Sequence, residues 1–487
     1  MHGLGPAPAA RSPIATVIVA AVLAVVVCQV VGCGGGDDEA DPRTGLPIIL
    51  LGVDGLEWDV ALPLRERGKL PNLSALMARG VAGMLDTLTP TLSPVVWTTI
   101  ATGKTSAKHG IPHFALQRPD GTIRLFTNTD RKTKALWNIL SDHGRRVGVV
   151  GWWMTYPVEP VNGVMVAQTN TAAQVDTSAG RQVWKGTLIE GVPDQVYPAT
   201  RQAEMLAVLE QVDRELPELT ARIFGPETAP RTELGRRLWD NCRWAFRADA
   251  TYARIALGLA REQPPFDVLL VYLGGPDVVG HRFWRYMRPD LYRYPPAAEE
   301  AAGLGRVIED YYEYVDEILG ELVAAAGPEA TFLVVSDHGM KPVNQEARFD
   351  PDAPPADVNS GHHVDAPPGV FVAAGPLIRV PALALGSESR DSSSPLDRDR
   401  LPRIGSVLDI TPTILTMLGI PVGLDMDGIV LRNPLADEVR MAPQPPAVAT
   451  HDTPEFRAAR GARALPRRRD PSEQERLEQL RSLGYLE

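Results

Sequence analysis

Aspartate and histidine residues recur in the second half of the chain, beside apolar runs. Asp277 and His281 are four residues apart, a spacing that places both side chains on one face of a helix. Asp337–His338 follows one apolar run directly, and His362–His363 precedes another. Carboxylates and imidazoles bind divalent metal ions. Each of these short motifs also occurs on solvated helices and in turns, but their joint placement favours a metal site.

The cysteines exclude other kinds of metal site and scaffold. Only three are present, Cys28, Cys33 and Cys242, and no two form a Cys-x-x-Cys pair. A thiolate zinc cluster and a disulfide-rich scaffold are therefore both excluded. Any metal ion in this protein must be bound by histidine and carboxylate side chains.

A hydroxyl-bearing segment, residues 91–103, is the second candidate for chemistry. Ser93 and Pro94 predict a turn into a helix, whose N-terminus offers free N–H groups and the positive end of its dipole to an anion. A serine hydroxyl beside a metal ion could ionise and act as a nucleophile. The alternative is that Ser93 only caps the helix. Thr91 lies two residues earlier, outside this anion site.

These residues require elements that bring distant parts of the chain together. Apolar runs without alternation predict buried strands at residues 47–54, 146–151, 266–272, 331–337 and 369–375. Helical patterns lie between them. The sequence therefore predicts an α/β fold, a doubly wound and mostly parallel sheet with helices on both faces. Because ligands gather at the C-terminal ends of parallel strands, Asp54 and Asp337 lie at the expected edge.

The N-terminus has the features of an export signal. Its apolar run, residues 14–27, is shorter than the ~20 residues that a membrane span needs. Val30-Val31-Gly32-Cys33 resembles a bacterial lipobox, in which the cysteine is acylated. We expect residues 1–33 to be a lipoprotein signal peptide ending at Cys33, and residues 34–45 to be a flexible tether. A plain signal peptide or a short membrane anchor is the alternative.

Charge and composition indicate the remaining domain boundaries and the kind of partner. The formal net charge is −11, so binding to a nucleic-acid duplex is not expected. We expect a catalytic domain at residues 46–434 with a helical cap insertion at 176–263. A Pro/Ala/Arg-rich extension at 435–487 is expected to be loosely ordered to about residue 470 and to end in a short helix. The expected location is the periplasmic or outer cell surface of a bacterium, with a lipid on Cys33 in the membrane.

Taken together, the motifs resemble the alkaline phosphatase superfamily, in particular its type I phosphodiesterase/nucleotide pyrophosphatase branch. They occur in the family's order from residue 48 to about residue 431. The matching segments are Gly52-Val53-Asp54-Gly55, Ser93-Pro94-Val95-Val96-Trp97, Asp277-Val278-Val279-Gly280-His281, Ser336-Asp337-His338-Gly339-Met340, Gly361-His362-His363 and Asp409-Ile410-Thr411-Pro412.

The resemblance implies a site with two divalent metal ions, usually zinc, with manganese or iron as alternatives. The residues implied at the metal ion beside the nucleophile are Asp54, Asp337, His338 and the nucleophile itself, Ser93. Those implied at the other metal ion are Asp277, His281 and His363. His363 is preferred over His362 because relatives show a Gly-x-His pattern.

The implied function is hydrolysis of phosphate esters of the phosphodiester or nucleotide pyrophosphate type, in a small molecule or a lipid headgroup. One alternative is a phosphomonoesterase, or a phosphonate or phospholipid-headgroup hydrolase of the same fold. The other is an inactive lipoprotein that only binds its ligand. A formylglycine sulfatase site is disfavoured because Ser93 is followed at once by proline. Trp97, Trp152 and Trp153 either line a leaving-group pocket or pack in the core.

Overall fold

The computed structural model describes residues 1–3, 45–117, 123–168, 188, 192–225, 232–348, 359–380 and 397–462. Contacts divide the chain into the units Met1–Thr44 and Gly45–Glu487, and the second unit contains the fold. The predicted signal peptide, tether and C-terminal helix lie outside the described residues, apart from residues 1–3 and 45.

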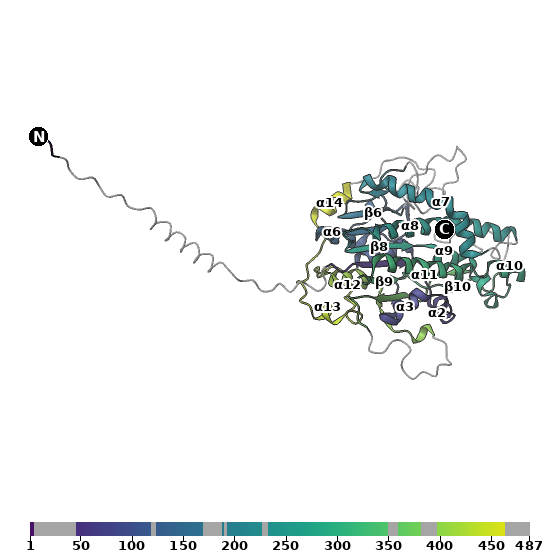
Figure 1. The fold of residues 1–487 in the computed structure, drawn as a ribbon. Helices are drawn as coiled ribbons and strands as arrows, with labels where there is room; N and C mark the ends of the chain where they lie inside the picture. Colours follow the sequence, from purple (N-terminus) through teal and green to yellow (C-terminus); the bar gives the residue numbers. More distant parts are fainter. Residues whose placement is uncertain are drawn as a thin grey trace. The chain divides into compact units, whose positions relative to one another are not determined.

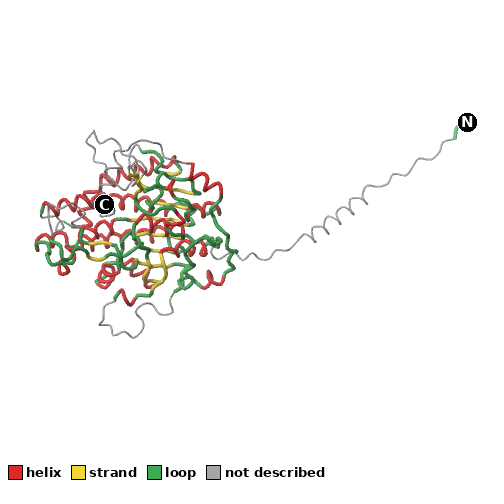
Figure 2. The backbone as a smooth tube through the Cα atoms, turned by 180° about the vertical axis from the view of Figure 1, so that it is seen from behind, coloured by secondary structure: helices red, strands yellow, loops and turns green. Residues whose placement is uncertain are grey.

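A sheet of nine strands forms the centre of the described fold, with strands in yellow between helices in red in Figure 2. The strand order is β13-β2-β12-β9-β1-β8-β5-β6-β7, and all strands run in one direction except β7 and β12. The strands are β1 (Ile48–Val53), β2 (Val81–Asp86), β5 (Val147–Val150), β6 (Gly163–Val166), β7 (Val196–Tyr197), β8 (Val268–Leu273), β9 (Thr331–Val335), β12 (Gly369–Ala374) and β13 (Arg403–Ser406). Two small ladders pair β3 (Ala115–Gln117) with β4 (Ile123–Leu125) and β10 (Lys341–Pro342) with β11 (Gly361–His362).

Alternate residues of each strand contribute to two hydrophobic clusters on opposite faces of the sheet. In β1, Ile49 and Leu51 belong to one cluster and Ile48 and Leu50 to the other. The first cluster is covered by α2 (Trp58–Glu66), α3 (Pro71–Arg79), α7 (Gln202–Phe224), α8 (Glu233–Ala260), α9 (Gly275–Met287) and α11 (Val307–Ala326). The second is covered by α4 (Ser93–Thr102), α6 (Leu136–Asp142) and α12 (Ile410–Met417). The predicted α/β sheet with helices on both faces is confirmed.

The helices of the first face include both helices of the segment predicted as an insertion. α8 packs on β8 and β5 and lies beside α9 and α11, as Figure 1 shows. α7 packs on α8 and α11. α10 (Ala298–Leu304) packs on α9. No helix in the described ranges is both long enough and apolar enough to cross a membrane.

Three neighbouring strands position the predicted metal ligands. β1 lies between β9 and β8 and is parallel to both. Asp54 directly follows β1, and its N–H donates to the carbonyl of Leu273, the last residue of β8, over 2.9 Å. Asp337 follows the end of β9 by two residues, and α9 begins one residue beyond Gly274, directly after β8. Aspartates from distant parts of the sequence therefore meet at one edge of the sheet.

The expectation of loose order after residue 435 is wrong for residues 435–462. This segment forms α13 (Asp437–Met441) and α14 (Pro454–Ala462), and Leu435 and Val439 are buried. Buried ion pairs explain the order, because the Pro/Ala/Arg-rich composition gives no apolar pattern. Asp452 accepts from Lys104, and Arg460 of α14 pairs with the buried carboxylate of Glu159.

Gly52 on β1 leaves space for the indole ring that supports Asp54, and its substitution tests this packing. A Cβ at Gly52 would lie 2.5 Å from the ring of Trp97. We expect Gly52→Ala to lower the free energy of unfolding by about 1–3 kcal/mol, because the ring must move in a packed core. Gly258→Ala is the matched control, because Gly258 is an exposed residue inside α8 with nothing within 4 Å of its added Cβ. It should gain up to about 1 kcal/mol. Chemical unfolding measures both, and equal stability of the two variants would contradict this packing.

Candidate active site

Six buried residues from four segments meet at the C-terminal edge of the sheet. They come from the loop after β1, from α9, from the loop after β9 and from the residue that follows β11. Each is at most 5% exposed. They are Asp54, Asp277, His281, Asp337, His338 and His363, the residues that the sequence predicts as metal ligands.

One group of ligand atoms surrounds the end of β1. The carboxylates of Asp54 and Asp337 and the imidazole of His338 each offer one atom, and these atoms lie within 4.8 Å of one another. His338 Nε2 is 3.4 Å from Asp54 Oδ1 and 3.3 Å from Asp337 Oδ2. Two carboxylate oxygens and one imidazole nitrogen at this spacing could hold one divalent metal ion.

A second group lies beside it and shares His338. Its members are Asp277, His338 and His363, whose ligand atoms also lie within 4.8 Å of one another. His281 Nε2 is 3.4 Å from Asp277 Oδ1, and His363 Nε2 is 3.8 Å from the same oxygen. The rings of His338 and His363 stack with centroids 4.0 Å apart. His338 therefore lies between the two aspartate groups, whereas the sequence predicts it for only one.

The imidazole rings are turned so that Nε2 faces the carboxylates. His281 Nδ1 bonds to Gly361 O at 2.9 Å, and His338 Nδ1 bonds to Gly339 O at 3.0 Å. A ring that donates from Nδ1 to a carbonyl keeps a lone pair at Nε2, which is the form that binds a metal ion. His362 differs, because its Nδ1 accepts from the N–H groups of His363 and Val364.

Burial and mutual repulsion shift the pKa values of the acids. Burial and then the charge of Asp277 raise the pKa of Asp54. Burial and then the charges of Asp54 and Asp277 raise the pKa of Asp337 well above its usual value. Burial also acts to raise the pKa of Asp277, but the neighbouring imidazoles outweigh it and the net shift is downward. Burial and then the charge of His338 lower the pKa of His363 well below its usual value. The shift at His363 favours a neutral imidazole, and the shifts at Asp54 and Asp337 favour protonated carboxyl groups.

The hydrogen bonding of three atoms of the first ligand group indicates whether a cation fits this site. Asp54 Oδ1, Asp337 Oδ2 and His338 Nε2 are buried and have no hydrogen-bond partner within the described part of the chain. Buried polar atoms are normally paired, and an unpaired one needs an explanation such as an ion. All three are metal-ligating atoms, and all three face one another. The residues present fit a divalent metal ion.

Asp54 is held in place by two donors that the sequence did not predict for this role. Its second oxygen, Oδ2, accepts from Trp97 Nε1 at 3.0 Å and from the hydroxyl of Tyr272 at 2.7 Å. Trp97 and Trp152 are fully buried, Trp153 is 7% exposed, and the first two rings pack edge to face. The core interpretation of these tryptophans is confirmed.

Ser93 lies in the first turn of α4. Residues on either side of it in the sequence contact the two ligand groups. Leu92 is the N-cap, so Ser93 is the first helical residue and not the cap. Ser93 is 3% exposed. Trp97, one turn later, bonds to Asp54. Thr91, two residues earlier, donates its hydroxyl to His363 O over 2.5 Å. The hydroxyl of Ser93 therefore lies in the short segment that spans the two ligand groups.

The first turn of α4 corrects one sequence-based expectation, and the residue before it adds a contact to the site. The N–H groups of Val95 and Val96 both donate to Leu92 O, and Pro94 has no N–H, so within the described residues only the Ser93 amide of this turn lacks a partner. The expected set of free N–H groups is thus reduced to one. Thr91 contacts the second ligand group, because its hydroxyl also approaches His363 Nδ1 at 3.4 Å. Loop geometry decides both points, and no local pattern encodes it.

Two further carboxylates, which the sequence analysis missed, position the loops that carry the ligands. Glu57 Oε1 accepts from Asp59 N at the start of α2, and its Oε2 accepts from Met340 N, two residues after His338. Burial raises the pKa of Glu57 to about 7. Glu57 therefore joins the loop after β1 to the loop after β9. Its place three residues after Asp54 is the only sequence signal that could have indicated this role.

Asp249 of α8 holds the helix that carries Asp277 and His281. Its two oxygens accept from Gly274 N at 2.9 Å and Gly275 N at 2.8 Å, the N-terminus of α9. Tyr311 of α11 donates its hydroxyl to the same carboxylate over 2.8 Å. Burial raises the pKa of Asp249 to about 6. A Cβ at Gly275 would lie 1.9 Å from the Tyr311 hydroxyl, so this close packing requires glycine.

The fold is therefore an α/β sheet whose strand ends carry buried aspartate and histidine groups that could hold metal ions. The family model of type I phosphodiesterase/nucleotide pyrophosphatase matches residues 48–391, which is more than half of the chain. The chain belongs to this family.

Individual relatives are distant. The 2,3-bisphosphoglycerate-independent phosphoglycerate mutase of Synechococcus elongatus is 28% identical over 198 residues, 40% of this chain and 29% of the mutase. The chain thus spans less than a third of the length of this curated relative. Human ectonucleotide pyrophosphatase/phosphodiesterase 5 is 13% identical with a TM-score of 0.42, over 77% of this chain and 95% of that one. Phosphonoacetate hydrolase from Sinorhizobium meliloti 1021 is 19% identical with a TM-score of 0.36, over 61% and 57%.

Removal of the Asp249 carboxylate should loosen the N-terminus of α9. We expect Asp249→Ala to lower the free energy of unfolding by about 1–3 kcal/mol, because two buried N–H groups lose their acceptor. Zinc affinity should fall by ~10–100-fold, the scale for groups that orient metal ligands. Asp240→Ala is the control on the same helix, since the Asp240 side chain is 67% exposed. Calorimetric zinc titration that gives equal affinities for the two variants would show that Asp249 does not position the site.

Proposed function

We propose that the protein is a two-metal phosphoric ester hydrolase in which Ser93 is the nucleophile. The observation that supports it most is the set of buried, unpartnered atoms of Asp54, Asp337 and His338 beside the segment that carries Ser93. Metal ions at such a site neutralise charge on a phosphoryl group and lower the pKa of a nearby hydroxyl. Family membership supports the reaction class.

In the proposed reaction Ser93 forms the new bond, and other residues hold the metal ligands in position. Ser93 Oγ forms a bond to phosphorus and gives up its proton to solvent, while the ester oxygen leaves and takes a proton from solvent. Water then attacks the phosphoseryl ester, which releases the phosphate product and restores the serine. Trp97 and Tyr272 hold Asp54, and Thr91 holds His363, throughout both steps.

We assign the metal-ligating residues to two sets, one for each metal ion, and His338 lies where the two sets are closest. We assign Asp54, Asp337 and His338 to the metal ion beside Ser93. Asp277, His281 and His363 are assigned to the other ion. The oxygen and imidazole ligands suit zinc, and they also accept manganese or iron. The stacking of His338 on His363 brings the two sets as close as a pair of ions ~4 Å apart requires.

The ester type separates the main proposal from its alternatives. Bis-p-nitrophenyl phosphate, p-nitrophenyl phosphate, a phosphonate ester and a sulfate ester should be compared on zinc-loaded protein, alongside zinc content. We expect the phosphodiester to be turned over fastest and activity to disappear on chelation. Preference for the monoester or the phosphonate would favour those alternatives. No turnover of any ester at two zinc ions per chain would favour the inactive binding lipoprotein.

The nucleophile can be tested against the neighbouring hydroxyl. Ser93→Ala should lower turnover by at least ~10⁴-fold, the scale for a lost nucleophile, while zinc content stays unchanged. Thr91→Val should lose only ~10–100-fold, because it releases His363 without removing the attacking group. Ser93→Thr should recover part of the activity. Near-normal turnover in Ser93→Ala, with a larger loss in Thr91→Val, would move the nucleophile and refute this assignment.

We also propose that the protein is an exported bacterial lipoprotein anchored through Cys33. The Val-Val-Gly-Cys run at residues 30–33 supports this, and it lies outside the described residues. The anchor would keep a phosphate-ester hydrolase at the periplasmic or outer cell surface, where phospholipid headgroups and small phosphate esters are both within reach.

Acylation is tested by a pair of cysteine variants. Cys33→Ser should abolish incorporation of a labelled fatty acid and release the processed chain from the membrane, because the thiol that is acylated is gone. Cys28→Ser should leave both unchanged, because that residue is removed with the signal peptide. Fatty-acid labelling that persists in Cys33→Ser would overturn the lipoprotein proposal.

A further inference from the structure

A cavity lies at the far end of α4 from Ser93. Its volume is about 700 Å³. Lys104 on its wall follows the C-cap of α4, and a ten-residue helix is about 15 Å long, so the cavity is separate from the metal site. The other walls are the loop at residues 129–133 and the segment that ends in α14. The cations that line it are Lys104, Lys108, Arg131, Lys132, Arg457 and Arg460.

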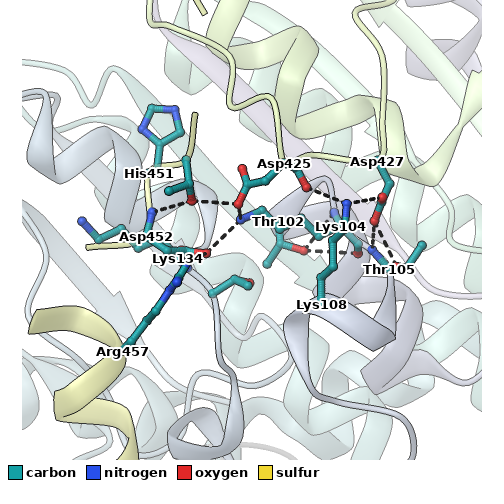
Figure 3. A network of polar contacts seen from close by, with 12 residues as sticks. Thr102, Lys104, Thr105, Lys108, Lys134, Asp425, Asp427, His451, Asp452 and Arg457 are labelled. Carbon is teal, nitrogen blue, oxygen red and sulfur yellow. Dashed lines mark hydrogen bonds and ion pairs between the residues drawn. The ribbon is translucent and has the colours of Figure 1, made fainter. Parts of the chain in front are cut away.

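The acidic side chains that line this cavity already have ion-pair or hydrogen-bond partners. Figure 3 shows Lys104 between Asp425 and Asp452. Lys104 Nζ is 2.6 Å from Asp425 Oδ2 and 2.9 Å from Asp452 Oδ2, and the side chains of Lys104 and Asp452 are 3% and 2% exposed. Asp452 Oδ1 accepts from Lys134 N at 2.6 Å. Asp130, the third lining acid, accepts from the amide and hydroxyl of Thr127 in its own turn.

Three of the remaining cations have partners behind the wall. Arg131 and Arg460 both pair with the buried carboxylate of Glu159. Lys108 pairs with Asp427, which also accepts from Thr105 N, as Figure 3 shows. These pairs fix the loop, α5 (Ser106–His109) and α14 relative to one another, so the cavity is preformed.

Two cations at the exposed rim have no short ion pair. The side chain of Arg457 of α14 is 59% exposed and pairs only at 3.9 Å, with Asp452 Oδ2, among the described residues. Lys132 is exposed, its stem packs over Gly110, and no ion pair forms for it among the described residues. Two buried atoms of the lining, Arg131 Nε and Thr133 Oγ1, also have no hydrogen-bond partner in the described ranges. The rim therefore presents the positive charge of Lys132 and Arg457 to the cavity.

We propose that this cavity binds a phosphate-bearing anion at a site separate from the metal centre. An arginine fork and lysine ammonium groups around a concave surface are the usual phosphate ligands in proteins. The phosphate belongs to a soluble compound or to an anionic phospholipid headgroup, because both present the same group to Lys132 and Arg457. The proposal does not depend on the reaction at Ser93.

Calorimetric titration of the full chain in detergent tests the proposal with two probes. Inorganic pyrophosphate represents the soluble source, and dihexanoyl phosphatidylglycerol represents the headgroup, with dihexanoyl phosphatidylcholine as the zwitterionic comparison. Chelation should remove phosphate binding at the metal centre and leave the second binding event. Lys132→Glu/Arg457→Glu should weaken that second event at least tenfold and leave turnover at Ser93 unchanged.

The control and the outcomes separate the two sources. Arg222→Glu/Arg236→Glu changes the net charge equally at two exposed arginines of α7 and α8, each 54% exposed, and should leave both affinities unchanged. Loss of pyrophosphate binding alone assigns a soluble ligand, and loss of phosphatidylglycerol binding alone assigns a headgroup. Equal affinity of the rim variant and the control variant for both probes, after chelation, would overturn the proposal.

Discussion

Burial of three carboxylates at the ends of adjacent parallel strands is the constraint on which this structure depends. Asp54, Asp277 and Asp337 are each at most 5% exposed, and like charges held this close in a dry site oppose folding unless positive charge lies between them. The neighbouring imidazoles present Nε2 to these acids. Repulsion between the three carboxylates would otherwise push the strand ends apart. The surrounding hydrogen-bond donors hold the carboxylates in place, and a cation binds most favourably between them.

α4 connects the two ends of this arrangement. Its first residue, Ser93, lies in a segment that contacts both ligand groups, and the chain beyond its last turn lines the cationic cavity. The helix is buried along its whole length, so it is a rigid element between two polar sites. Ion pairs fix the cavity end, and the hydrogen bond from Trp97 to Asp54 fixes the other.

The sequence predicts the sheet from local patterns, and it predicts from the order of family-like motifs which aspartates and histidines lie together at the sheet edge. A non-alternating apolar run marks a strand covered on both faces, and Asp54 or Asp337 at its end follows from parallel packing. What could not be predicted depends on contacts between distant elements. Asp249 has no local signal, since its role exists only because α8 lies beside the start of α9. Tyr272 resembles any apolar strand residue until its hydroxyl is seen to bond to Asp54. The order of residues 435–462 likewise comes from ion pairs to remote residues and not from their composition.

The central claim, that the crowded acids and imidazoles form a pair of cation sites, is tested most directly by anomalous scattering from zinc-soaked crystals of the full chain. The account predicts two peaks ~4 Å apart. One should lie within ~2.0–2.2 Å of ligand atoms of Asp54, Asp337 and His338, and the other equally close to ligand atoms of Asp277 and His363. A single peak, or peaks that leave Asp54 Oδ1 and Asp337 Oδ2 without a metal neighbour, would contradict it.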